Sequence, residues 1–294
     1  MIKLIASDMD GTLLGSNHDI SEENIKAIKL AQENGIHFAI STGRAYDDVK
    51  PFIEKYDLNC ECAALNGGEY IDKEGNIIES VYIDHEKARD TLDEMLKFNL
   101  QIEIYTDKGY YTTSTKEEMM KGMLKRAKAF NPEIKDEKEL HEEALKNPHF
   151  VNMNYISDIG EFFKSDVKIG KFVSFAETVE EIQEVKDHMS KIDGLAISSS
   201  FETNIEINHE DATKGKILLK AAEKMGITRE EVAVFGDSYN DYTMFKEFPN
   251  SYAMKNAIPM IKEAAGFITD KNTEDGVAKG IYKILQNQES IINA

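Results

Sequence analysis

The sequence predicts an α/β protein with a parallel-sheet core and a second domain inserted into it. Short apolar strands alternate with amphipathic helices in both terminal parts of the chain, which is typical of a parallel sheet. In the middle, this alternation gives way to a less regular mixture of helices and strands. We therefore predict a discontinuous, Rossmann-like core of residues 1–83 and 208–294, and an inserted α+β domain of residues 84–207.

The first part of the core is predicted as a β-α-β-α-β unit followed by a hairpin. Ser21 is a typical N-cap for the first helix, which ends at Gly35, and the second helix runs to about Tyr56. A β-α-β repeat implies right-handed crossovers and parallel strands. Strands are expected at residues 2–6, 36–40 and 63–65, and the hairpin at 69–71 and 77–79.

The rest of the chain carries similar signals. In the insert, Thr115 with Glu118 and Thr178 with Glu181 have the spacing of capping boxes. Thr213 is a typical cap for a helix that returns the chain to the core. The remaining strands are expected at residues 102–105, 171–175, 204–207, 232–235, 251–254 and 266–268, and helices at 214–225 and 275–286.

Charge and composition limit the possible partners. The 294 residues carry a formal net charge of −19, which argues against nucleic acid or an anionic membrane as a partner. We find neither a leader pattern nor an apolar run of the ~20 residues that a membrane span requires. Cys60 and Cys62 lack a second cysteine pair to complete a zinc site. We expect a cytoplasmic protein with reduced thiols and no obligate protein partner.

Polar side chains follow the predicted strands of the core. Ligands of open parallel sheets bind beyond the carboxyl ends of the strands. Several carboxylates at that edge would repel one another unless a cation lay among them, and oxygen ligands favour a hard cation such as Mg²⁺. Such a site suits a phosphorylated ligand. The residues expected there are Asp8, Asp10, Ser41, Thr42, Asn66, Asp237, Asn240 and Asp241.

Lys214 is a second indication of an anion site. A cation is unfavourable in the first turn of a helix, and we expect this lysine, partly exposed at the helix start, to bind phosphate. Each signal also has a simpler interpretation. Lys214 could be a solvated lysine, Asp10 could belong only to a turn, Thr42 with Gly43 could only start a helix, and Asp241 could cap one.

Taken together, these motifs resemble the haloacid dehalogenase-like hydrolase superfamily, and within it the Cof-type phosphatases with a large inserted cap. The resemblance extends over nearly the whole chain. Lys255 departs from it, since many relatives have glycine there, and residues 209–211 are more polar than usual. The matching segments are Asp8-Met9-Asp10-Gly11-Thr12-Leu13, Ser41-Thr42-Gly43-Arg44, Thr213-Lys214-Gly215, Gly236-Asp237-Ser238-Tyr239-Asn240-Asp241, residues 253–257 and residues 274–278.

The resemblance implies a role for each matching position. Asp8 would be the nucleophile and Asp10 the general acid and base, with Lys214 as the third catalytic residue. The cap would close over the site and contact the substrate. Mg²⁺ would be held by Asp8, the backbone carbonyl of Asp10, Asp237 and Asp241, and phosphate by Thr42, Gly43, Lys214 and Asn240.

The function predicted from this resemblance is a Mg²⁺-dependent phosphatase acting through an aspartyl-phosphate intermediate. Its partner would be a small phosphorylated metabolite, with sugar phosphates as the default class. Two alternatives remain open at this point. A phosphomutase would use the same core with a phosphorylated cosubstrate, and a phospho-acceptor signalling domain would hold the phosphoryl group without turnover.

Overall fold

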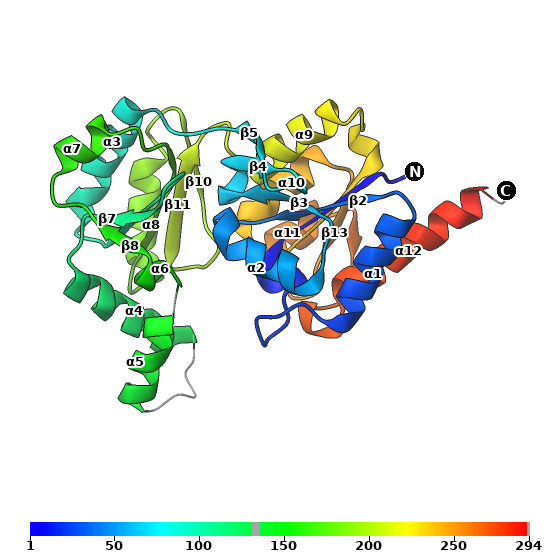
Figure 1. Ribbon diagram of the computed structural model, residues 1–294, viewed down its shortest axis with the longest axis horizontal. Helices are drawn as coiled ribbons and strands as arrows, with labels where there is room; N and C mark the ends of the chain where they lie inside the picture. Colours follow the sequence, from blue (N-terminus) through cyan, green and yellow to red (C-terminus); the bar gives the residue numbers. More distant parts are fainter. Residues whose placement is uncertain (131–135, 147, 293–294) are drawn as a thin grey trace. The chain divides into compact units, whose positions relative to one another are not determined.

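The computed structural model describes residues 1–130, 136–146 and 148–292, and it divides into two compact units (Figure 1). Unit 1 contains Met1–Val81, Ser198–Phe201 and His209–Ala294, and unit 2 contains Tyr82–Ile197 and Glu202–Asn208. The short segment Ser198–Phe201 differs from the expected insert, because it belongs to unit 1. Its backbone carbonyls accept hydrogen bonds from residues near 240, which explains this assignment.

Unit 1 is built on an eight-stranded sheet in the order β14-β13-β12-β1-β2-β3-β4-β5. Neighbouring strands from β14 to β3 are parallel, while β4 and β5 add an antiparallel hairpin. The strands are β1 (Leu4–Ser7), β2 (His37–Ser41), β3 (Glu61–Ala64), β4 (Glu69–Ile71), β5 (Ile77–Ser80), β12 (Val232–Gly236), β13 (Asn250–Ala253) and β14 (Phe267–Ile268). This sheet confirms the predicted fold class.

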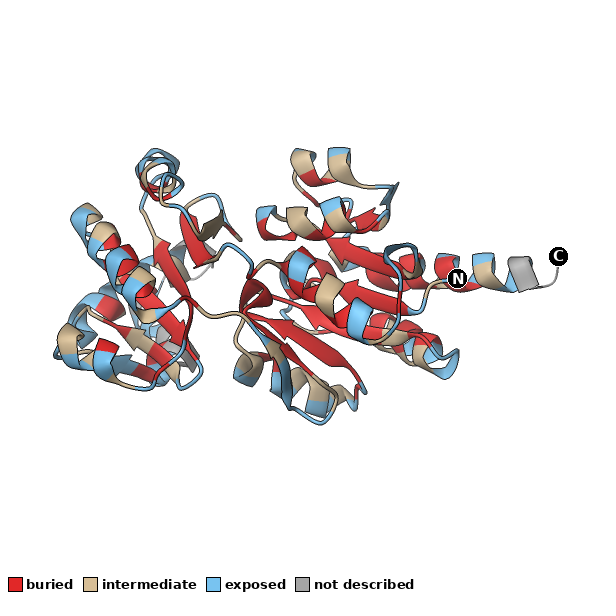
Figure 2. Ribbon diagram, turned by 90° about the horizontal axis from the view of Figure 1, so that it is seen from above, coloured by how far each residue is buried: buried red, intermediate tan, exposed pale blue. Residues whose placement is uncertain are grey.

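Helices cover both faces of this sheet. Helix α1 packs against α12, α9 packs against α10, and Figure 1 places these two pairs on opposite sides of the strands. The predicted cap is present, since the Ser21 hydroxyl accepts the Asn24 amide at 3.1 Å. Figure 2 shows that the central strands are buried. The helices are α1 (Glu22–Glu33), α2 (Tyr46–Tyr56), α9 (Lys214–Lys224), α10 (Tyr242–Glu247), α11 (Pro259–Ala264) and α12 (Gly276–Ile292).

The strand order changes direction at β1. From β1 the chain continues to β2 and β3 on one side, whereas β12, β13 and β14 follow one another on the other side. Such a switch point is where open α/β sheets bind ligands, at the carboxyl ends of the strands. Asp8 comes directly after β1 and Asp237 directly after β12, so the topology brings these two carboxylates together.

Unit 2 contains a six-stranded sheet in the order β10-β11-β9-β6-β7-β8, antiparallel from β11 to β7. Its strands are β6 (Ile102–Thr106), β7 (Gly109–Thr112), β8 (Met153–Tyr155), β9 (Ile169–Phe175), β10 (Leu195–Ser198) and β11 (Asn204–His209). Its helices are α3 (His85–Met95), α4 (Lys116–Phe130), α5 (Glu137–Lys146), α6 (Pro148–Val151), α7 (Ile159–Lys164) and α8 (Val179–Met189). The sequence analysis did not predict β7, β8 or β10.

The two capping boxes expected in unit 2 form to different degrees. Thr115 and Glu118 exchange both backbone-to-side-chain hydrogen bonds, at 2.7 and 3.2 Å. Thr178 accepts the Glu181 amide at 3.2 Å, but the Glu181 carboxylate accepts the amide of Glu177 instead of that of Thr178. The second motif is therefore an N-cap at Thr178, in which the return hydrogen bond of the capping box is shifted by one residue to Glu177.

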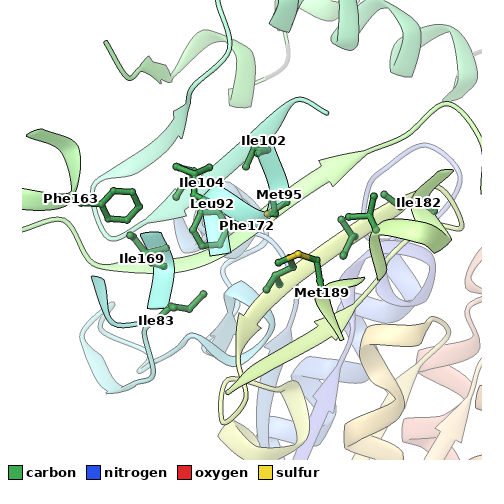
Figure 3. Close-up of a cluster of buried hydrophobic side chains, with 14 residues drawn as sticks. Ile83, Leu92, Met95, Ile102, Ile104, Phe163, Ile169, Phe172, Ile182 and Met189 are labelled. Carbon is green, nitrogen blue, oxygen red and sulfur yellow. The ribbon is translucent and has the colours of Figure 1, made fainter. Parts of the chain in front are cut away.

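The two faces of the sheet in unit 2 differ in chemistry. One face packs apolar side chains such as Ile104 and Phe172 against Leu92 of α3 and Met189 of α8 (Figure 3). Because side chains alternate along a strand, Lys171 points to the other face. Lys171 forms an ion pair with Glu206 there, and Arg126 forms one with Glu103. Among the described residues, no helix is long and apolar enough to cross a membrane.

Candidate active site

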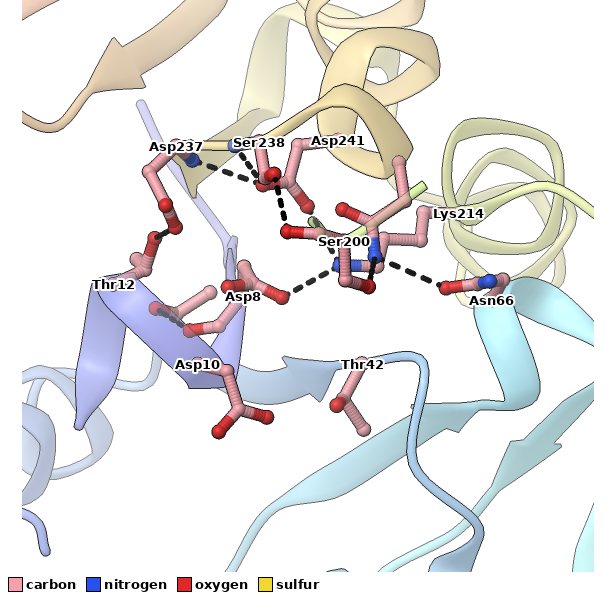
Figure 4. A network of polar contacts seen from close by, with 12 residues as sticks. Asp8, Asp10, Thr12, Thr42, Asn66, Ser200, Lys214, Asp237, Ser238 and Asp241 are labelled. Atoms are coloured by element: carbon pink, nitrogen blue, oxygen red, sulfur yellow. Dashed lines mark hydrogen bonds and ion pairs between the residues drawn. The ribbon is translucent and has the colours of Figure 1, made fainter. Parts of the chain in front are cut away.

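The centre of the candidate site is a lysine enclosed by carboxylates (Figure 4). Lys214 Nζ lies 2.6 Å from Asp8 Oδ1 and 2.6 Å from Asp241 Oδ1. The side chain of Lys214 is 0% exposed, so the expectation of a partly exposed lysine is wrong. Burial would lower the pKa of this ammonium, but the charges of Asp241 and Asp8 raise it. Lys214 is therefore held as a buried cation.

Asp241 combines the two interpretations that the sequence left open. Its Oδ1 contacts Lys214, and its Oδ2 accepts the backbone amides of Asp237 and Ser238 at 2.9 and 3.0 Å. Asp241 thus caps the turn that follows β12 and also belongs to the ionic cluster. The cap fixes the carboxylate, because three donors determine its position.

Three carboxylates, of Asp8, Asp237 and Asp241, offer oxygen atoms within 4.8 Å of one another. They face one ammonium, so the fully ionised cluster carries two excess negative charges. Burial and the charge of Asp241 raise the pKa of Asp8 well above its ordinary value, and the same two causes raise the pKa of Asp237 to about 7. Oxygen ligands with excess negative charge fit a hard divalent cation. These residues could therefore hold a metal ion.

Thr12 and Gly11 orient Asp237, a role that the sequence analysis did not assign to them. The Thr12 hydroxyl donates to Asp237 Oδ1 at 2.6 Å. Gly11 has a φ of +82°, and a Cβ at this position would lie 2.5 Å from Asp237 Oδ2. Only glycine fits both the backbone conformation and this close approach. The glycine of the first motif is thus required by the carboxylate of the fourth motif.

Asp10 lies outside the group of carboxylates around Lys214. Its carboxylate instead accepts two hydrogen bonds from Arg44, with Nε–Oδ2 at 2.8 Å and Nη2–Oδ1 at 2.6 Å. The side chain is 43% exposed, whereas Asp8 is buried. The carboxylate of Asp10 is thus available to a molecule in solution, and only its backbone carbonyl remains a predicted metal ligand.

Apart from Lys214 at the start of α9, the predicted phosphate-binding residues lie in two segments of unit 1 that follow strands. Thr42 and Gly43 follow β2, and Thr42 Oγ1 accepts the amide of Arg44 at 3.2 Å. Asn240 Nδ2 donates to Asn66 Oδ1 and to Ser200 Oγ, both at 3.2 Å.

Ser200 is a site residue that the sequence analysis missed. It lies inside the range expected for the insert, and a run of three serines at 198–200 is its only signal. Lys255, the departure noted above, is exposed and lies 3.9 Å from Asp270, so it takes no part in the cluster.

Comparison with known proteins identifies the family. The profile of a family described as haloacid dehalogenase-like hydrolase matches residues 5–281. The chain belongs to the haloacid dehalogenase-like hydrolases. The predicted family and fold class are thereby confirmed.

Several curated relatives of this hydrolase are named phosphatases. Phosphatase YwpJ of Bacillus subtilis is 34% identical over 97% of this chain and 100% of its own length. The 5-amino-6-(5-phospho-D-ribitylamino)uracil phosphatase YwtE of the same organism is 33% identical over 98% of this chain and 99% of its own. A solved haloacid dehalogenase-like hydrolase from B. subtilis superimposes with a TM-score of 0.84 at 33% identity, covering 96% of this chain and 99% of that one. The predicted enzyme class, a phosphoric monoester hydrolase, is confirmed.

Proposed function

We propose that this hydrolase is a Mg²⁺-dependent phosphatase that cleaves small phosphomonoesters through a phosphoenzyme on Asp8. The observation that carries the proposal is the ionic imbalance around Lys214, where three carboxylates, two of them buried, face one ammonium. Burying a charge without a partner costs free energy, so the cluster is suited to bind a cation. A bound divalent cation would in turn attract and orient a phosphate group. Mg²⁺ bound by Asp8, Asp237 and Asp241 would neutralise this charge and that of the phosphoryl group.

In the first step, a carboxylate oxygen of Asp8 attacks phosphorus and the bond from phosphorus to the leaving oxygen breaks. Lys214 contacts Asp8 at 2.6 Å, so its charge stabilises the negative charge that collects around the nucleophile. Asp10 supplies a proton to the leaving oxygen. Its exposed carboxylate suits this role, because the leaving group must depart toward solvent.

In the second step, Asp10 takes a proton from water and the water oxygen attacks phosphorus. The bond between phosphorus and Asp8 breaks, which releases phosphate and regenerates the carboxylate of Asp8 and the protonated acid of Asp10. Thr42 and Asn240 are suited to hydrogen-bond the phosphoryl oxygens, because both lie in segments that follow parallel strands of the same sheet.

The proposed substrates are small phosphorylated metabolites, with sugar or polyol phosphates as the first class to test. The net charge of −19 supports a compact ligand over a polyanion. The relative YwtE carries the name of a phosphatase for a phosphorylated ribitylamino compound, which supports the same class. Phosphate release from a panel of such esters, without a phosphorylated cosubstrate, distinguishes a phosphatase from a phosphomutase.

The decisive experiment separates the two aspartates by acid-quench trapping with an aryl phosphate. Asp8→Asn should form no phosphoenzyme. Asp10→Asn should slow turnover ~100- to 10,000-fold, as expected for the loss of proton transfer. Because a good leaving group needs little protonation, this variant should accumulate an acid-stable, hydroxylamine-labile phosphoenzyme. Label on Asp10, serine or histidine would overturn the assignment, and a long-lived wild-type phosphoenzyme without turnover would indicate a signalling domain.

A further inference from the structure

Arg44 is a charged residue of unit 1 to which the proposed mechanism gives no task. It makes a bidentate contact with Asp10, whose two carboxylate oxygens each accept one hydrogen bond from the guanidinium. Planar, bidentate pairs of this kind fix the orientation of a carboxylate as well as its position. We infer that Arg44 is a positioning residue, which holds the carboxylate of Asp10 in the orientation that proton transfer requires. This inference rests on the proposed function.

The need for such a residue follows from the surroundings of Asp10. Its side chain is 43% exposed and lies apart from the hydrogen-bonded network of Lys214, as Figure 4 shows. An exposed carboxylate samples several rotamers. Proton transfer, by contrast, needs the donor and acceptor within about 2.6–3.2 Å of each other. Holding the side chain in one rotamer therefore has a direct effect on the rate.

Arg44 is itself held firmly enough to act as a support. Its amide donates to Thr42 Oγ1 at 3.2 Å, and its carbonyl accepts the amide of Leu65 at 2.9 Å. The guanidinium carbon lies 5.6 Å from the centre of the Phe52 ring. Backbone and side chain are thus both anchored, while the side chain remains 27% exposed.

The contact also leaves Asp10 free to react. A carboxylate offers about four lone-pair positions, of which the two bonds from Arg44 occupy two. The remaining positions of Asp10 can carry the proton that is donated to the leaving oxygen, and they can accept a hydrogen bond from the attacking water. Lysine could not replace this arrangement, because its ammonium is a point charge without a planar pair of donors.

A double-mutant cycle with Asp10 tests the inference. Arg44→Met, which keeps an unbranched side chain beside Phe52, should lower kcat about 100-fold with little change in KM, as expected for misplacing a reacting group by about 1 Å. With a good leaving group it should accumulate phosphoenzyme on Asp8, as Asp10→Asn does. The double variant should be no slower than Asp10→Asn, because no carboxylate remains to be positioned.

Two further variants sharpen the cycle. Arg44→Lys should have a kcat between those of Arg44→Met and the wild type, because lysine restores the positive charge but not the planar pair of donors. Arg229→Met, which breaks an ion pair with Glu247 elsewhere in unit 1, is the matched control and should behave as wild type.

Several outcomes would contradict the inference. A raised KM at unchanged kcat would make Arg44 a ligand of the substrate phosphate, and losses that multiply in the double variant would show that Arg44 acts independently of Asp10. In both cases wild-type turnover through Asp8 would leave the proposed function intact. Wild-type protein without turnover or phosphoenzyme would overturn the proposed function, and the role of Arg44 with it.

Discussion

Lys214 in unit 1 and Lys171 in unit 2 are both buried lysines in contact with carboxylates, but their surroundings differ. Lys171 Nζ pairs with Glu206 at 2.9 Å and lies 4.7 Å from the centre of the Tyr105 ring. Lys214 contacts two carboxylates at 2.6 Å, with a third in the same group.

The surroundings of Lys171 include a second pair, in which Arg126 lies 2.8 Å from Glu103. Each of these carboxylates in unit 2 thus has a basic partner of its own. In unit 1 the acids outnumber the base.

We interpret this difference as one between buried charges that contribute to the structure, in unit 2, and buried charges that serve the proposed function, in unit 1. A buried ion pair gains little net stability, because desolvation offsets the attraction, but the loss of one partner costs several kcal/mol. The pairs of unit 2 satisfy one another and can persist without a ligand. The cluster of unit 1 has an excess of negative charge when it is fully ionised, which supports the proposed cation site. The following experiments test this contrast.

Metal removal should have the largest effect. If the acidic excess around Lys214 is a cation site, a chelator should abolish hydrolysis of an aryl phosphate, and Mg²⁺ should restore it. Calcium should inhibit, because its longer bonds and higher coordination number disturb the geometry of transfer. Circular dichroism of the metal-free protein provides the control for folding. Full activity after exhaustive metal removal would refute the cation site.

The two lysines offer a matched pair of substitutions. Lys214→Met should lower kcat at least ~100-fold, as expected for removing a preorganised charge from the transition state. Lys171→Met should instead lower the free energy of unfolding by about 3–5 kcal/mol, because Glu206 loses its partner, and leave kcat near the wild-type value. Steady-state kinetics and denaturant unfolding measure the two quantities. A folded Lys214→Met variant with normal kcat would remove the contrast.

The smallest effect concerns pH and stability. Asp237 has an ordinary pKa of 3.8, which burial raises to about 7 in the folded protein. The protonated acid therefore favours the folded state, and this stabilisation is lost as pH rises from about 4 through about 7. Mg²⁺ binds the ionised carboxylate, so it should raise Tm more at pH 8 than at pH 5.

Thermal unfolding with and without Mg²⁺ measures this difference. At one hundred times its dissociation constant, Mg²⁺ adds about 2.7 kcal/mol to the free energy of unfolding. Asp237→Asn should flatten the pH dependence. An equal shift of Tm at both pH values in the wild type would contradict the interpretation.

The sequence predicted the features that depend on local pattern. Alternating strands and helices gave the parallel core, and Thr213 caps α9 as expected, with its hydroxyl accepting the Lys216 amide at 3.3 Å. The burial of Lys214 was not predictable in this way. The local argument from the helix dipole indicated an unusual lysine, but its environment depends on residues 206 and 27 positions away.

The contact between Arg44 and Asp10 escaped prediction for a similar reason. It joins two loops through side-chain geometry, which residue type and spacing do not specify. The strands β7, β8 and β10 were also missed. With three or four residues each they are too short to show a clear alternation, but β4 and β5 are equally short and were predicted, so length alone does not explain the difference.

The pairing of β1 with β12 also has a consequence for the order in which the enzyme is assembled. Leu4 lies opposite Val232, so the central strand of unit 1 gains its second neighbour only after more than two hundred further residues have been synthesised. Contacts this distant in sequence form slowly and late. We expect unit 2, which is nearly continuous in sequence, to fold first on a growing chain, while Asp8 still lacks Lys214 and Asp237. A nascent chain therefore carries the proposed nucleophile, Asp8, long before the rest of the site is assembled around it.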